Sequence, residues 1–430
     1  MAAAALLAGA VYLLLAPAAL TGYLASPRLL ALTHLFTLGF VSLVFLGTLQ
    51  QLPAVMLVTD LAWPRLGVLS LPVAVIGIGL LVFGFASGID AALLASGGTL
   101  VTLALGLALA QLIATAAKRP PRDPAGRGLV TAVAYLFLTV LAGLLLASAR
   151  ASPAFAAAVG YSASLHQTLG LMGAFLLGIA AAGHKLLSMF ALSKGGPSWR
   201  LKWLTWAVHV AVATTLVRAF GPLLAAEVRQ YDALLGQLAT AGLVAAAGLQ
   251  LWEVKSILER RLRKRLEAPI VRYVLAHAFL PLAGLLLLLG YRSAATLLFM
   301  LGFVGLAVSG MLVKILSFLT WTSVYARRSN KVAAPPLLRE LMIARLEPVT
   351  TAGLAAGALL AGLAVISASQ PLAVLAAIGL VVGATSQLAQ VIVIVYRTLF
   401  GTSHSAAAAP PRPPLASGPA ADTTPGPRHG

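Results

Sequence analysis

Long apolar runs recur along the whole chain and constrain its fold more than any other feature. Each is close to the roughly 20 residues with which a helix crosses about 30 Å of hydrocarbon. In lipid the backbone must satisfy its own amides, and the runs lack strand-like alternation, so we expect helices rather than a β-barrel. The sequence predicts an all-α integral membrane protein with about 12 spans, near residues 3–24, 29–58, 66–88, 91–117, 128–149, 154–192, 203–224, 232–254, 268–290, 293–321, 349–369 and 371–398.

Composition and charge support this class. Hydrophobic residues make up 60% of the chain and charged residues only 10%, whereas soluble domains carry roughly 25% charged residues. The net charge of +19 could indicate nucleic-acid binding, but most of the basic residues fall in alternate connections, on one side of the predicted membrane. The positive-inside rule then places both termini in the cytoplasm. We expect contact with anionic lipid and none with nucleic acid.

The segments outside the spans are simple. Residues 1–400 form the expected helical bundle. Within it, residues 255–267 are expected to form a cytoplasmic amphipathic helix as a linker, and residues 325–348 a basic cytoplasmic loop. Residues 401–430 are rich in proline and alanine without apolar periodicity, which predicts a disordered cytoplasmic tail.

One phrase occurs three times within the apolar runs, with two glycines eight residues apart. The pairs are Gly39 and Gly47, Gly170 and Gly178, and Gly302 and Gly310. Each copy is followed by a polar residue near the cytoplasmic end of its run, namely Gln51, Lys185 and Lys314. The repetition predicts a bundle of related helical units. The two lysines can extend to the lipid headgroups; alternatively, the three polar residues bond carbonyls or carry protons at the cytoplasmic mouth.

Two histidines precede the first two copies of the phrase, His34 and His166. Both are expected near the extracytoplasmic ends of their spans, and ionisable groups at membrane depth are functional candidates. Gly170 and Gly173 lie one and two turns beyond His166 and could leave a flat space beside its imidazole. A planar macrocycle could bind there with His166 as an axial ligand. The alternative is structural: small residues let helices approach closely, and each imidazole bonds a neighbouring group.

The residues around His34 resemble those of a known family. The phrase over residues 33–40, with Gly47 and residues 51–55, resembles the second span of haem–copper oxidase subunit I-like proteins. Residues 166–190, and the run that ends at 314–319, look like the sixth and tenth spans. The resemblance extends to nitric-oxide-response proteins of the NnrS type. It implies a pseudo-threefold bundle of 12 spans with cytoplasmic ends, in which His34 is a haem ligand.

The chain also departs from the oxidase pattern. An oxidase of that family needs paired histidines on its seventh and tenth spans, but the seventh run here has only His209 and the tenth has none. We therefore expect no oxygen reduction at a haem–copper centre, and the sequence leaves open whether the chain is an enzyme. A single haem b held by His34 and His166 would fit respiratory electron transfer, with an electron-transfer partner, or nitrogen-oxide handling in a bacterial-type inner membrane. The alternative is a cofactor-free polytopic transporter or membrane assembly protein.

Overall fold

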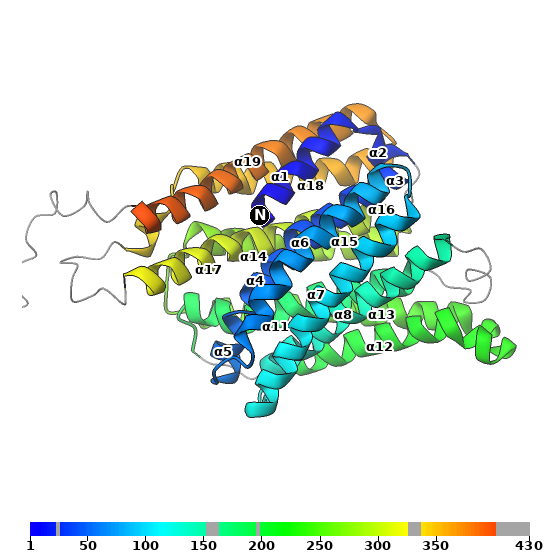
Figure 1. Cartoon of the computed structure of the whole chain (residues 1–430), viewed down its shortest axis with the longest axis horizontal. Helices are drawn as coiled ribbons and strands as arrows, with labels where there is room; N and C mark the ends of the chain where they lie inside the picture. The colour runs from blue at the N-terminus through cyan, green and yellow to red at the C-terminus, as the bar shows by residue number, and fades with distance from the viewer. Residues whose placement is uncertain (23–25, 152–162, 195–197, 326–336, 401–430) are drawn as a thin grey trace, which may run out of the picture.

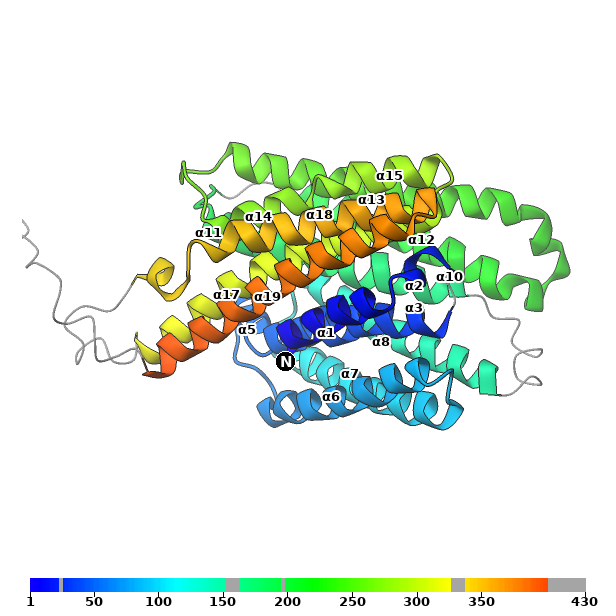
Figure 2. The ribbon, with the colours of Figure 1, turned by 90° about the horizontal axis from the view of Figure 1, so that it is seen from above.

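The described residues of this computed structural model form helices and no strand, and they cover 1–22, 26–151, 163–194, 198–325 and 337–400. The long helices run roughly along one common direction (Figure 1), and Figure 2 shows them stacked several helices deep. Eleven helical segments among the described residues are long and apolar enough to cross a membrane. The architecture is that of an all-α polytopic membrane protein, as the apolar runs predict.

The helices are named in chain order. The first half of the chain contains α1 (Ala2–Leu15), α2 (Ala18–Thr21), α3 (Pro27–His34), η1 (Leu35–Ser42), α4 (Leu43–Thr48), α5 (Leu52–Leu57), α6 (Pro64–Ala86), α7 (Ala91–Lys118), α8 (Pro124–Ala151), α10 (Ala163–Thr168), η2 (Leu169–Leu176) and α11 (Leu177–Phe190). The second half contains α12 (Trp199–Leu224), η3 (Ala226–Tyr231), α13 (Asp232–Glu259), α14 (Ala268–Ala276), α15 (Phe279–Leu288), α16 (Arg292–Leu297), η4 (Leu298–Gly305), α17 (Leu306–Val324), η6 (Leu338–Leu341), α18 (Leu346–Ser367) and α19 (Gln370–Phe400).

The first expected span differs most from the sequence prediction. Instead of one crossing over residues 3–24, α1 has 14 residues, which is about 21 Å at 1.5 Å per residue and short of the hydrocarbon thickness. The chain breaks at Ala16 and Pro17 before the short α2, because proline lacks an N–H and its ring crowds the preceding turn. The described residues therefore provide eleven candidate spans, and α1 is a shorter helix in addition to these. It packs against α19 and η1.

Two further boundaries differ from expectation. The second expected span ends early, because α4 stops at Thr48 and a turn precedes α5. The prediction of a separate short helix over residues 255–267 is wrong, because α13 continues through Glu259 and residues 260–267 form no helix. The expected tail over 401–430, the start of the sixth expected span, and residues 326–336 of the expected cytoplasmic loop lie outside the described residues.

The three helices that carry the repeated phrase lie deepest in the bundle. In the spans Pro27–Thr48, Ala163–Phe190 and Arg292–Val324, 56–78% of the most apolar stretch is buried by the rest of the protein. The other candidate spans bury only 22–44% of theirs. These three central helices therefore form the core, and the remaining helices surround them.

Each central helix contains a π-helical segment of eight residues, η1, η2 or η4. Each segment includes the first glycine of its phrase, which is Gly39, Gly170 or Gly302. Elsewhere in the described chain the helices are α-helical or 3₁₀-helical. π turns are rare and are frequently found at functional sites, so the repeated phrase coincides with a repeated and unusual backbone.

The outer helices pack as close pairs through glycines. A Cβ added to Gly353 of α18 would lie 2.6 Å from the backbone nitrogen of Gly383 in α19. A Cβ on Gly77 of α6 would lie 2.8 Å from the backbone nitrogen of Val101 in α7. Small residues at such crossings let two backbones approach closely, which drives helix association in lipid. These contacts hold α6 against α7 and α18 against α19.

Candidate functional site

The structure brings His34 and His166 together although 132 positions separate them in the sequence. Each is at or near the end of a short α-helix, α3 or α10, that leads into a π segment. The centres of the two imidazole rings lie 6.2 Å apart, with 25° between the ring planes. The two residues for which the sequence predicts a ligand role are therefore neighbours in the bundle.

Backbone carbonyls orient both imidazoles in the same way. His34 Nδ1 lies 2.7 Å from the Leu30 carbonyl oxygen, and His166 Nδ1 lies 2.9 Å from that of Thr139. A carbonyl oxygen can only accept, so Nδ1 is the nitrogen that carries the proton. In a neutral imidazole this leaves the lone pair on Nε2, the usual arrangement for a histidine that ligates a metal.

Two further residues fix the positions of the rings. Phe85 of α6 stacks on His34 with ring centres 4.7 Å apart and 24° between the planes. Gly143 of α8 lies against His166, because a Cβ at this position would be 3.0 Å from Cε1 of the imidazole. Sequence reasoning did not identify either residue, since each acts on a histidine far away in the chain.

The spacing of the rings suits one metal centre between them. Metal–imidazole bonds are about 2 Å long, so two imidazoles whose Nε2 edges face one metal have ring centres roughly 6 Å apart. The two rings here have that spacing and are nearly parallel, in a stacked arrangement. A bare metal ion needs more protein ligands, and no group of three or more ligating side chains occurs among the described residues. Haem iron takes four ligands from its own macrocycle and needs only axial residues. The donor set therefore fits haem better than a bare ion. The flat space predicted beside His166 is not found, however, because Thr139 lies 3.1 Å from where a Cβ of Gly170 would be and the Tyr135 ring 2.7 Å from that of Gly173.

The three polar residues predicted at the cytoplasmic ends do not join the histidine pair. Lys185 follows His166 by 19 residues in the same helix, about 28 Å at 1.5 Å per residue, and is exposed. Gln51 is exposed in the turn before α5. Its neighbour Gln50 makes the long-range contact instead: its side-chain amide and that of Gln111 exchange hydrogen bonds of 3.2 and 3.3 Å.

Lys314 lies inside the protein rather than reaching the headgroups. Its side chain is 3% exposed, and Nζ lies 2.5 Å from Glu267 Oε2 and 5.1 Å from the centre of the Phe190 ring. Arg263 donates to the other oxygen of Glu267 at 2.6 Å. Burial raises the pKa of the Glu267 carboxyl, but the bonds from Lys314 and Arg263 outweigh burial and hold this pKa below its usual value.

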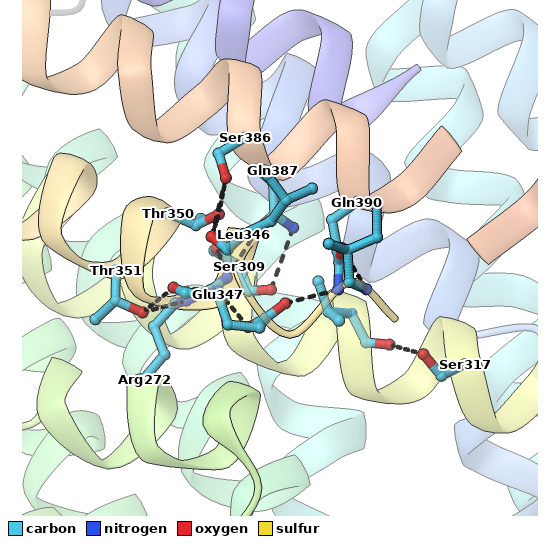
Figure 3. Close-up of polar contacts among 12 residues, drawn as sticks. Arg272, Ser309, Ser317, Leu346, Glu347, Thr350, Thr351, Ser386, Gln387 and Gln390 are labelled. Atoms are coloured by element: carbon cyan, nitrogen blue, oxygen red, sulfur yellow. Dashed lines mark hydrogen bonds and ion pairs between the residues drawn. The ribbon is translucent and has the colours of Figure 1, made fainter. Parts of the chain in front are cut away.

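A larger buried network surrounds Arg272 (Figure 3). Its fully buried guanidinium donates to Glu347 Oε2 at 2.5 Å. It also donates to Ser309 Oγ and Gln387 Oε1, both at 2.8 Å, and to Thr351 Oγ1 at 3.0 Å. Every nitrogen of the guanidinium is therefore bonded, and the network ties α14, α17, α18 and α19 together. Such a satisfied ion pair is structural, and we assign it no ligand.

A second buried carboxylate belongs to Glu253 of α13. Its two oxygens bond His184 Nδ1 at 2.7 Å and Arg200 Nε at 2.8 Å. Arg200 also donates to Ser256 at 2.6 Å. Sequence reasoning missed these pairs, because the partners come from separate helices and a single sequence carries no signal that joins them.

The remaining histidines of the described chain have ordinary side-chain partners. His209 Nδ1 lies 2.6 Å from the Tyr135 hydroxyl. The buried His277 lies between the Tyr273 carbonyl oxygen, 2.9 Å from Nδ1, and the Gln250 amide nitrogen, 2.9 Å from Nε2. Both imidazoles are therefore held by hydrogen bonds within the protein.

Comparison with known proteins adds no assignment to this geometry. No model of a protein family matches the chain, and no curated protein sequence is significantly similar to it.

Proposed function

We propose that this protein binds one haem b in the membrane, with His34 and His166 as its two axial ligands. The observation that carries the proposal is the pair of imidazoles 6.2 Å apart, each bonded through Nδ1 to a backbone carbonyl. In this assignment His34 and His166 would hold the iron through Nε2, and the carbonyls of Leu30 and Thr139 would fix the orientation of the two rings. Bound there, haem iron would exchange single electrons.

We further propose that the protein serves respiratory electron transfer or nitrogen-oxide handling, with an electron-transfer protein as its partner. The resemblance of the phrase around His34 to oxidase subunit I-like and NnrS-type proteins supports this role. We place the protein in a bacterial-type inner membrane with both termini in the cytoplasm, an orientation in which α1 and α2 together would make a twelfth crossing beside the eleven candidate spans. The support for this orientation is the gathering of basic residues on one side of the predicted spans.

A pseudo-threefold arrangement is part of the proposal. Each central helix is followed by a closely packed pair of helices, α6 and α7, α12 and α13, or α18 and α19. The next helix along the chain, α8 or α14, then packs against the central helix of the following unit. Because α1 contacts both α19 and η1, it takes the corresponding place between the third unit and the first, and would close the ring.

The test is a reduced-minus-oxidised absorption spectrum of the protein purified from haem-replete cells. We expect a Soret band and an α-band, with about one haem per chain. His34→Ala and His166→Ala should each remove the bands, whereas His209→Ala should retain them because His209 lies elsewhere and bonds Tyr135. Circular dichroism of each variant establishes whether the helices remain folded.

A contrary result would be equally clear. Wild-type protein that stays colourless after reconstitution with haem would overturn the proposal and leave the cofactor-free transporter or assembly protein as the alternative. Bands that persist in both His34→Ala and His166→Ala would show that haem binds away from this pair.

A further inference from the structure

A cavity of about 210 Å³ opens beside the central helices, near the end of the bundle that holds the histidine pair. It lies between η2, α13, α15 and η4, and its walls include Leu171, Leu243 and Phe299. Four polar residues also line it, Gln167 and Thr168 of α10 and Arg292 and Thr296 of α16. The cavity is thus an apolar space with a cationic and polar rim.

The rim carries an arginine that the described protein does not neutralise. Arg292 is the exposed first residue of α16, and it forms no ion pair with any residue that the structure describes. Arg218 offers a contrast on the same side of the predicted membrane, because it bonds Asp232 at 2.9 Å. An unneutralised guanidinium beside hydroxyl and amide groups matches a phosphate, which arginine binds through parallel hydrogen bonds.

The size of the cavity restricts the class of ligand. Sites for drug-sized molecules usually occupy 300–1,000 Å³, so a space of about 210 Å³ suits a flexible chain better than a bulky ring system. Gly284, in the wall formed by α15, has nothing within 4 Å of where its Cβ would lie. The wall therefore leaves open space at this position, into which an acyl chain can extend.

We propose that this cavity is a binding site for one anionic phospholipid. The phosphate would lie at Arg292 with the Gln167 amide beside it, and part of one acyl chain would fill the space between η2, α13 and α15. Thr296 completes the rim, with its hydroxyl donating to the Arg292 carbonyl oxygen at 2.9 Å. Neither His34 nor His166 is among the residues that line the cavity, so the proposal does not rest on haem binding.

The test is native mass spectrometry of the purified full-length chain, titrated with phosphatidylglycerol or with phosphatidylcholine. The wild-type protein should retain one phosphatidylglycerol more tightly than any phosphatidylcholine. Arg292→Gln removes charge-assisted hydrogen bonds and should weaken this binding at least tenfold. Arg229→Gln is the matched control, because Arg229 is also exposed on that side but does not line the cavity.

A second pair of variants tests the cavity itself. Gly284→Leu should fill the open space and prevent retention of the lipid, whereas Gly248→Leu should not. Gly248 also has nothing within 4 Å of where its Cβ would lie, and it is not among the lining residues. Thermal unfolding of both variants establishes that they fold, and the exposed Arg292→Gln gives a result independent of packing.

Three outcomes would overturn the proposal. The first is equal retention of phosphatidylglycerol and phosphatidylcholine by the wild-type protein. The second is unchanged retention of phosphatidylglycerol in both Arg292→Gln and Gly284→Leu. The third is a neutral isoprenoid quinone that co-purifies with the wild-type protein and is lost in Gly284→Leu, because the cavity would then take a different class of ligand.

Discussion

At the scale of single residues, the histidine pair depends on a neighbour without a side chain. A Cβ on Gly143 would lie 3.0 Å from His166 Cε1, so Gly143→Val should displace the imidazole and lengthen its bond to the Thr139 carbonyl. Changes to such supporting residues typically cost 10–100-fold in affinity. We expect at least a tenfold loss of haem affinity, measured by haem titration. Gly79→Val is the control, since nothing lies within 4 Å of that Cβ; equal affinities in both variants would contradict this geometry.

Neutralising one member of the buried Arg272–Glu347 pair should lower the free energy of unfolding by a large amount. Glu347→Gln leaves the fully buried guanidinium of Arg272 without its counter-ion, which should cost about 3–5 kcal/mol of unfolding free energy. Asp232→Asn, in the exposed pair with Arg218, should cost at most about 1 kcal/mol. Denaturant unfolding in detergent measures both variants. Similar losses in the two would mean that burial does not set the strength of the Arg272 pair.

Glu267 predicts a dependence of stability on acidity. Its pKa is held low in the folded protein by Lys314 and Arg263, whereas in the unfolded chain a glutamate titrates near 4.3. The stabilisation is therefore complete above about pH 4.3 and is lost as the pH falls through the lower folded value. Glu267→Gln should reduce the acid-dependent part of the fall in melting temperature between pH 6 and pH 3. An unchanged profile would contradict the assignment.

At the level of residues, the sequence singles out rare side chains but not their distant partners. The structure places His34 and His166 side by side, while their ligand role stays a prediction. His34 and His166 stand out because histidines are scarce in apolar runs. The sequence also marked Lys314, but not its bond to Glu267, which lies in the segment 255–267 that was expected to form a separate helix. The sequence marked Gln51, whereas the residue that makes the contact is its neighbour Gln50; both lie in the turn between α4 and α5. Only coordinates identify Gln50 as the residue that bonds Gln111.

At the scale of elements, apolar length predicted the existence of most helices, and proline or glycine chemistry altered their ends. The break after α1 at Pro17 is one example. The π segments were not predictable, because an i→i+5 pattern leaves no distinctive hydrophobic period within eight apolar residues. Each segment contains the first glycine of the repeated phrase, Gly39, Gly170 or Gly302. The repeated phrase therefore corresponds to a repeated π-helical backbone. Two of these segments directly follow the helices that carry the histidines.

The crossing of α18 and α19 predicts a cost for adding a side chain between two backbones. A Cβ on Gly353 would lie 2.6 Å from Gly383 N and 2.8 Å from Gly379 O. Backbone atoms cannot move aside as a flexible side chain can, so Gly353→Leu should force the helices apart. We expect the free energy of unfolding to fall by about 1–3 kcal/mol. Gly248→Leu should stay within about 1 kcal/mol of wild type; a comparable loss there would point to a general effect on helices.

At the scale of the whole molecule, the polar groups are divided between the two ends of the bundle. The buried carboxylates of Glu253 and Glu347 pair with arginines near the basic connections. The histidine pair and the polar rim of the cavity lie toward the other end. The sequence predicted that the two ends of the bundle differ in polar groups, because the basic residues of each connection can be counted without coordinates. It did not predict which helices are neighbours, since contacts between apolar faces are nearly interchangeable in lipid.

This division leads to a prediction of orientation that the chain is well suited to test, because it contains no cysteine. Single cysteines can be placed at exposed positions of opposite ends, Ser87→Cys after α6 and Lys194→Cys after α11. The positive-inside rule predicts that a membrane-impermeant maleimide labels Ser87→Cys in intact cells, and Lys194→Cys only after permeabilisation. Labelling in the reverse order would place the histidine pair toward the cytoplasm, so an electron-transfer partner would have to approach from that side.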